Sequence, residues 1–123
     1  MNYIEKVDGI RVINKMLNIR IRDFYIYNKL IKKVLNIKTN IPIFINDSIV
    51  LLPIKTYKAY DCIWINFIEI KEVIDYYDKT IIKFKNGIVK TFNIKLDKLN
   101  RIISNAKIVI NYFNNLDIEN VNN

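Results

Sequence analysis

One stretch decides the fold: residues 60–91, with the sequence YDCIWINFIEIKEVIDYYDKTIIKFKNGIVKT. Its second half predicts a β-hairpin, because the side chains of residues 80–85 alternate between two sets and the chain then meets Asn86-Gly87. Asn-Gly is the strongest two-residue hairpin signal, since a type I′ turn needs a positive φ at both central residues. A slip of one residue would exchange the two faces of the strands, so this turn is expected to fix the register of the sheet.

A second hairpin is predicted for Ile41–Ile54. Pro42 opens an apolar strand, Asn46-Asp47-Ser48 makes the turn, and Pro53 ends the returning strand. Proline at the first residue of a strand, or just past its last, is where the missing N–H donor does least harm.

The only tryptophan, Trp64, and the only cysteine, Cys62, follow in an apolar segment. We expect both in the core, with Cys62 as a small buried hydrophobic residue. A reactive thiol would be favoured by a cationic neighbour or a helix N-terminus. A further strand is predicted around Val73–Tyr77.

Two segments have the period of a helix. Over Leu96–Phe113, apolar residues recur at three- and four-residue steps, which predicts a helix that packs on a sheet. A shorter helix is predicted for Lys29–Ile37, with Asn28 as its N-cap. Its apolar stripe is expected to comprise Leu30, Ile31, Val34 and Leu35.

The N-terminal segment, Met1–Asn28, is predicted to form a strand pair that ends in a short aromatic strand, Phe24–Tyr27. Isoleucine and arginine alternate over residues 19–22. In an extended segment this alternation would place Arg20 and Arg22 on one face, opposite the isoleucines.

Together these elements predict the α+β class. We expect a mostly antiparallel sheet, or a partial barrel like that of a pleckstrin-homology domain, closed by the C-terminal helix. The shorter helix would lie in the N-terminal half. With 123 residues, 51% of them hydrophobic, the chain is expected to form a single domain over residues 1–115. The asparagine-rich residues 116–123 are expected to be a flexible tail.

The charge balance indicates an anionic partner. Twenty Lys and Arg against twelve Asp and Glu give a formal charge of +8. Double-stranded DNA is the first candidate and a membrane surface a distant second, while an ordinary solvated positive surface is the alternative. Lys55 and Lys58 lie beside tyrosines, a mixture that suits contact with a nucleic-acid backbone plus base stacking. The candidate DNA contacts are Arg20, Arg22, Lys29, Lys32, Lys33, Lys55 and Lys58.

The composition argues against an enzyme. The chain has no histidine, one cysteine and two glycines, which argues against histidine-based triads, cysteine–histidine zinc sites and glycine-rich phosphate loops. We predict no cofactor, metal or catalytic residue. The carboxylates between Glu69 and Asp78 are expected to be solvated side chains of a hairpin. A single cysteine suggests a reducing cytoplasm, and the apolar run at 41–54 is too interrupted to cross a membrane.

A set of short motifs resembles the competence transcription factor family, ComK, over about residues 41–113. Individually these motifs are weak, and their order and spacing carry the resemblance. They are Pro42-Ile43, Leu52-Pro53, Cys62-Ile63-Trp64-Ile65, Phe84-Lys85-Asn86-Gly87 and Ile94 before the final helix.

The resemblance implies a small DNA-binding activator that binds AT-rich promoter DNA, largely through the minor groove and as an oligomer. Narrow A-tract minor grooves attract Lys and Arg, so the basic composition suits this implication. The chain is shorter than typical members, so control through adaptor-mediated proteolysis is not carried over, although a regulatory protein partner remains a further possibility. The main alternative is a protein-interaction module that does not bind DNA, and a third possibility is peripheral binding to anionic lipid.

Overall fold

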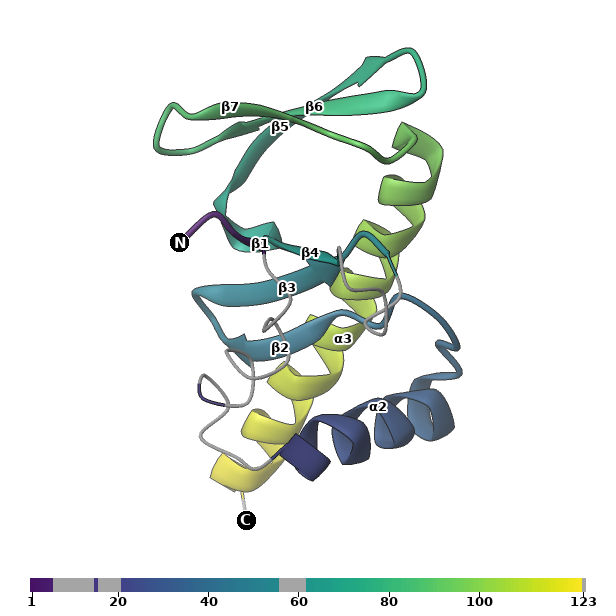
Figure 1. Ribbon diagram of the computed structural model, residues 1–123. Helices are drawn as coiled ribbons and strands as arrows, with labels where there is room; N and C mark the ends of the chain where they lie inside the picture. The colour runs from purple at the N-terminus through teal and green to yellow at the C-terminus, as the bar shows by residue number, and fades with distance from the viewer. Residues whose placement is uncertain (6–14, 16–20, 56–61, 123) are drawn as a thin grey trace.

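The computed structural model describes residues 1–5, 15, 21–55 and 62–122, with side chains from residue 24 to 55 and from 62 to 116 in the last two ranges (Figure 1). Within these residues, seven strands form two antiparallel sheets, and two helices accompany them. The α+β class and the C-terminal packing helix are therefore confirmed. In chain order the elements are β1 (Tyr3–Glu5), α2 (Ile21–Leu35), β2 (Ile43–Asn46), β3 (Ile49–Pro53), β4 (Ile63–Asn66), the 3-10 turn η1 (Phe67–Glu69), β5 (Ile70–Tyr76), β6 (Lys79–Phe84), β7 (Val89–Phe92) and α3 (Leu96–Asn122).

The strands divide between a four-stranded sheet, in the order β1-β4-β3-β2, and a three-stranded sheet, in the order β5-β6-β7. The short turn η1 carries the chain from β4 of the first sheet to β5 of the second. Helix α3 runs from the three-stranded sheet past the four-stranded sheet towards α2 (Figure 1). It continues to Asn122, beyond the end at Phe113 that the apolar periodicity predicts.

The main core lies where α3 meets both sheets. Leu99, Ile102 and Ala106 of α3 are buried in one cluster with Ile65 of the first sheet and Phe84 of the second. The helix therefore holds the two sheets together through a single apolar stripe, as its three- and four-residue spacing predicts. At the other end of the same helix, the ring of Phe113 stacks on Phe44 of β2, with 4.9 Å between the ring centroids.

The β6–β7 hairpin is confirmed, but its predicted turn type is wrong. Thr80, Ile82 and Phe84 are buried and the intervening Lys83 is exposed, so the predicted alternation of faces holds. The Gly87 N–H donates to the Phe84 carbonyl oxygen (3.0 Å), and Gly87 has a φ of +90°. Asn86 has no positive φ, so the loop is a three-residue turn closed by one left-handed glycine and not a type I′ turn.

The hairpin predicted for Ile41–Ile54 is also confirmed, as β2 and β3. The Asn46 side chain accepts a hydrogen bond from the Ser48 N–H (2.8 Å), which stabilises the turn. Trp64 of β4 and Cys62, which immediately precedes this strand, are 2% and 4% exposed, so both lie in the core as expected. The strand predicted around Val73–Tyr77 is β5.

Helix α2 corrects the reading of the N-terminal half. It begins at Ile21 and ends at Leu35, so the aromatic strand predicted for Phe24–Tyr27 is wrong. Phe24 and Ile31 are fully buried at helical spacing, and Phe24 packs edge-on against Trp64 (5.9 Å between ring centroids). Tertiary packing against the sheet therefore selects a helix where aromatic residues favour a strand locally.

The predicted cap and stripe of this helix are wrong as well. Asn28 lies in the middle of α2 and not at its start, where it is 5% exposed and its Nδ2 has no hydrogen-bond partner. Leu30 and Val34 are 42% and 46% exposed, so they do not share the inward face with Ile31. With Ile26, which is 58% exposed, they form an apolar ridge at four-residue steps on the outer side of α2, and we call these three residues the α2 ridge.

The Tyr27 hydroxyl forms two hydrogen bonds that connect α2 to β2 of the four-stranded sheet and to the residue before it. Its hydroxyl donates to the Pro42 carbonyl oxygen (2.8 Å) and accepts from the Phe44 N–H (3.0 Å). Burial raises the pKa of the Tyr27 phenol above its usual range, and the hydrogen bond from Phe44 opposes this only in part. The neutral hydroxyl is therefore the form that the fold stabilises.

We expect Tyr27→Phe to lower the free energy of unfolding by about 1–3 kcal/mol near neutral pH, because it leaves the Phe44 N–H and the Pro42 carbonyl unpaired. The folded pKa is raised, so the stabilisation by Tyr27 is complete below the unfolded pKa of about 10 and is lost above it. In urea titrations, the difference in the free energy of unfolding between the parent chain and Tyr27→Phe should therefore become smaller from about pH 8 to about pH 11. A constant difference over that range would contradict this assignment.

Candidate nucleic-acid interface

A basic cleft lies where the three-stranded sheet passes into α3. It has a volume of about 520 Å³, and residues from the end of β3, the β5–β6 turn and the start of α3 line it. Four cationic side chains border the cleft against two carboxylates, so its local charge is positive. The cations are Lys55, Lys95, Lys98 and Arg101, and the carboxylates are Asp78 and Asp97.

Three of these cations share one side of α3. Lys95, Lys98 and Arg101 follow one another at three-residue steps, which keeps neighbours close on the surface of a helix. All three are exposed, and in the described part of the chain none of them forms an ion pair. Lys95 immediately precedes the helix, and its carbonyl oxygen accepts from the Leu99 N–H (3.0 Å). Lysine is not a favoured N-cap residue, and a lysine side chain has no oxygen that could accept from the free N–H groups of the first turn.

Lys55 contributes to the cleft from the other sheet. It lies two residues after the end of β3. Between them, the Ile54 N–H donates to the Ile63 carbonyl oxygen of β4 (3.1 Å), so the chain stays beside β4 up to this point. The buried Cys62 thiol donates to the Lys55 carbonyl oxygen at 3.6 Å, which fixes the backbone at this point. The Lys55 side chain is half-buried. Among the predicted contacts it is the one that the described structure places in this cleft.

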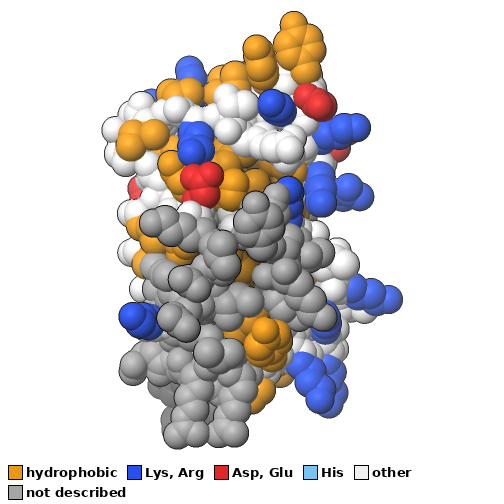
Figure 2. Space-filling model, in the orientation of Figure 1, with side chains coloured by type: hydrophobic (Ala, Val, Ile, Leu, Met, Phe, Trp, Pro, Cys, Tyr) orange, Lys and Arg blue, Asp and Glu red, His pale blue; other side chains and the backbone are white. Residues whose placement is uncertain are grey.

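The predicted lysines of α2 form a separate group. Lys29, Lys32 and Lys33 are all exposed, on the side of the helix away from the buried Phe24 and Ile31. Figure 2 shows Lys and Arg side chains following the right-hand edge of the molecule, where Asp and Glu are fewer. In the same view of the ribbon, the start of α3 lies at the upper part of this edge and α2 at the lower part (Figure 1).

The remaining predicted contacts are two arginines and Lys58. Arg22 belongs to α2, so the extended segment that would have aligned it with Arg20 is wrong at this residue. The side chain of Arg22, and the whole of Arg20 and Lys58, lie outside the described residues. They stay predictions.

Sequence reasoning missed Lys95, Lys98 and Arg101, although their spacing was visible. Three cations at three-residue steps, at the start of the predicted helix from Leu96, are on one side of that helix. The apolar stripe that predicts this helix lies on its inward face and gives no information about the cationic side. What no spacing could show is that Lys55 from a distant strand faces the same cleft.

Acidic side chains are the other candidates for a functional site in the described structure. The carboxylates Glu72, Asp75 and Asp78 are exposed side chains of the β5–β6 hairpin. Within residues 1–5, 15, 21–55 and 62–122, no group of three or more His, Cys, Asp or Glu residues could hold a metal ion. Neither described helix is long and apolar enough to cross a membrane.

Comparison with known proteins identifies the family. The family model described as ComK protein matches residues 2–116, which extends the resemblance from about residues 41–113 to nearly all of the chain. Among curated proteins and among solved structures, no match was found. Since the family model covers far more than half of its length, the chain belongs to the ComK family of competence transcription factors.

Proposed function

We propose that this chain is a transcriptional activator that binds double-stranded, AT-rich DNA largely through the minor groove. The observation that carries the proposal is the basic cleft, where Lys95, Lys98 and Arg101 project beside Lys55 without ion-pair partners of their own in the described structure. Cations held on one side of a helix suit the regular spacing of phosphates along a duplex. Family membership supports a role in transcription, which in turn suits the cytoplasm of a bacterial cell.

Minor-groove binding needs neither a recognition helix nor a base-reading motif. A·T and T·A pairs present almost the same groups in that groove, so the readout there depends on groove width and on electrostatic potential. The exposed lysines of α2 would extend the contact beyond the cleft, along the phosphate backbone of the DNA. The proposal assigns phosphate contacts to Lys29, Lys32, Lys33, Lys55, Lys95, Lys98 and Arg101.

The α2 ridge supports a second candidate function, as a protein-interaction module. Ile26, Leu30 and Val34 expose 58%, 42% and 46% of their surfaces on one line along the helix. An apolar line of this kind is a common contact for a partner helix or for a second copy of the chain. The same ridge would serve the homo-oligomer that the activator proposal includes. Size-exclusion chromatography with light scattering on the Leu30→Lys variant would show whether the ridge holds copies together.

The deciding experiment is a fluorescence-anisotropy titration against an A-tract duplex and a GC-rich duplex of equal length at two salt concentrations. We expect tighter binding to the A-tract. The four phosphate contacts of the basic cleft would alone lower the affinity about a hundredfold between roughly 50 and 200 mM salt, and the three lysines of α2 would add to this loss. An absence of binding to both duplexes at the lower salt concentration would reject the DNA proposal and favour the interaction module.

A further inference from the structure

The outer edge of β5 has no strand beside it in the described structure. The three-stranded sheet has the order β5-β6-β7, so Ile70–Tyr76 pairs with β6 on one side only. Apart from the ladder with β6, the backbone hydrogen bond given for this strand among the described residues is from the Ile70 N–H to the Phe67 carbonyl oxygen of η1, at the start of the strand. In an antiparallel ladder every second residue directs its N–H and C=O away from its neighbour, so this edge presents a row of unpaired donors and acceptors.

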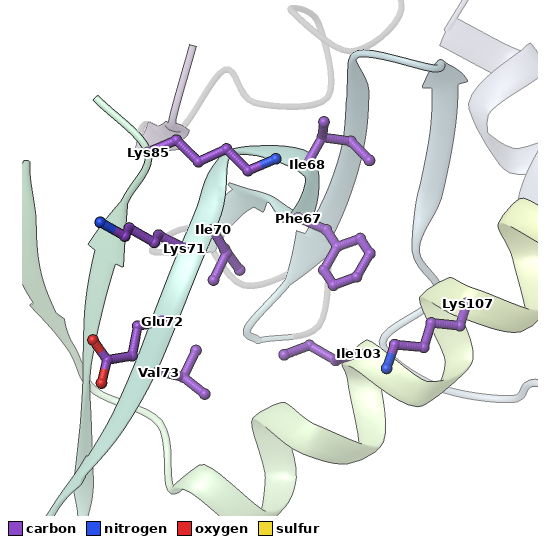
Figure 3. A pocket seen from close by; sticks show the side chains of 9 residues that line it. All are labelled: Phe67, Ile68, Ile70, Lys71, Glu72, Val73, Lys85, Ile103 and Lys107. Carbon is purple, nitrogen blue, oxygen red and sulfur yellow. The ribbon is translucent and has the colours of Figure 1, made fainter. Parts of the chain in front are cut away.

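A hollow runs along this free edge. It has a volume of about 360 Å³, within the usual range for ligand clefts, and it lies between η1 and β5 on one side and α3 on the other. In Figure 3 the side chains of Phe67, Ile70, Val73 and Ile103 point towards one another around the hollow. All four are half-buried. The floor of the hollow is therefore apolar and open to an apolar side chain from outside.

A register shift in β5 explains how the strand borders the hollow. The pairing with β6 shifts between Ile70 and Glu72, which leaves Lys71 as an extra residue. Lys71 and Glu72 are both exposed, and their side chains point away from the hollow in Figure 3. Since both residues nevertheless line it, the part of them that borders the hollow is their backbone.

The charges at the rim are positive. Lys85 extends from the β6–β7 turn over one end of the hollow near Ile68, and Lys107 projects from α3 on the opposite bank (Figure 3). The one carboxylate among the lining residues, Glu72, forms an ion pair with Lys83 at 3.7 Å on the far side of the strand. An occupant therefore meets cations on both banks and no free carboxylate among the lining residues.

We propose that this edge binds an extended peptide segment of a partner protein, in which apolar and acidic residues alternate. Its backbone would add a strand to β5, and its apolar side chains would enter the hollow. Its carboxylates would lie at the rim, where they are attracted by the positive charges of Lys85 and Lys107. This site shares no lining residue with the basic cleft, so the proposal does not depend on DNA binding.

The test uses a short fluorescent peptide of alternating valine and glutamate, titrated against the full chain by anisotropy. We expect saturable binding, and slower hydrogen exchange at those amides of β5 that point away from β6. Lys107→Glu and Lys85→Glu should each weaken binding by roughly fivefold to tenfold, since each exchanges an attraction for a repulsion. Lys38→Glu is the matched control, because it makes the same charge change at an exposed lysine that lines neither the hollow nor the basic cleft, and it should leave the affinity unchanged.

Two further ligands separate strand addition from other modes of binding. The same peptide with alternate backbone nitrogens methylated cannot pair with a strand, and it should fail to bind. Equal binding by this methylated peptide would overturn the proposal. The proposal would also be overturned if a medium-chain fatty acid bound and the valine–glutamate peptide did not. The hollow would then be a site for a small amphiphile. Circular dichroism of each variant confirms that the exposed substitutions leave the fold intact.

Discussion

The triple variant Lys95→Gln, Lys98→Gln and Arg101→Gln should bind an A-tract duplex about a hundredfold more weakly than the parent chain at roughly 100 mM salt. Each of these side chains borders the basic cleft, and in the described structure none is neutralised by an ion pair. Every lost phosphate contact also releases one counterion fewer. The slope of log affinity against log salt should therefore become shallower by about 2.7 for three contacts. Anisotropy titrations at several salt concentrations measure both quantities.

The matched control is the triple variant Lys71→Gln, Lys79→Gln and Lys83→Gln. It removes the same number of charges from exposed positions of the three-stranded sheet, none of which lines the cleft. Lys83 gives up an ion pair with Glu72 in which both side chains are about half exposed, which contributes little to stability. We expect this control to weaken binding only slightly. Equal losses in the two triple variants would show that net charge alone attracts DNA, and the cleft would then lose its role.

Sequence periodicity predicted the second half of the fold well, because local pattern and tertiary packing agree there. Residues 80–85 alternate in sequence and also alternate between buried and exposed in the structure. The apolar steps along α3 match the residues that pack into the core. Asn86-Gly87 marked the position of the turn but not its type, because a left-handed glycine serves a three-residue loop as well as a two-residue loop.

The N-terminal half was predicted poorly, because local pattern and packing disagree. Aromatic and β-branched residues at 24–27 favour a strand by propensity, yet Phe24 is fully buried against Trp64 on a helix. Asn28 resembles an N-cap in sequence, but the inward face of the helix continues through it. Buried polar groups are usually hydrogen-bonded, so sequence rules do not predict a buried asparagine whose Nδ2 is unpaired.

For the candidate site, the sequence predicted a positively charged surface but not the position of the cleft. Net charge indicated an anionic partner, and Lys29, Lys32 and Lys33 could be placed on the outer side of a helix. The cleft depends on the approach of Lys55 to the start of α3, which is a tertiary contact between residues far apart in the chain. The free edge of β5 is also a property of sheet order, which a single sequence does not reveal.

Asn66 should be among the positions least tolerant of substitution, although nothing in its sequence context distinguishes it. It is 1% exposed at the end of β4, where the chain leaves the first sheet for η1. Its Oδ1 accepts from the Val50 N–H (3.0 Å) and the Ile68 N–H (3.3 Å). Its Nδ2 donates to the carbonyl oxygens of Met1 (3.0 Å) and Ser48 (3.1 Å). One side chain thus joins the N-terminus, the β2–β3 hairpin and the junction between the sheets.

We expect Asn66→Ala to lower the free energy of unfolding by about 3 kcal/mol, because the fully buried Val50 loses the partner of its N–H and the other three groups lose theirs. Asn66→Asp keeps an acceptor for Val50 and Ile68 but loses both donations. It also places a buried carboxylate against two carbonyl oxygens, so it should be at least as unstable. Urea titrations followed by tryptophan fluorescence measure all variants, since Trp64 lies in the same strand.

The control for this prediction is Asn2→Ala. It removes the exposed hydrogen bond from Asn2 Nδ2 to Asn86 Oδ1 (3.2 Å) and leaves the Asn2 carbonyl free to accept from the Asn66 N–H (2.7 Å). It should change the stability by no more than about 0.5 kcal/mol. If Asn66→Ala were as mild as this control, the four bonds would not determine how the sheets join, and the apolar stripe of α3 would be sufficient to hold them. A large loss, with faster amide exchange in β1, would show that polar contacts at one residue fix the N-terminal strand in place.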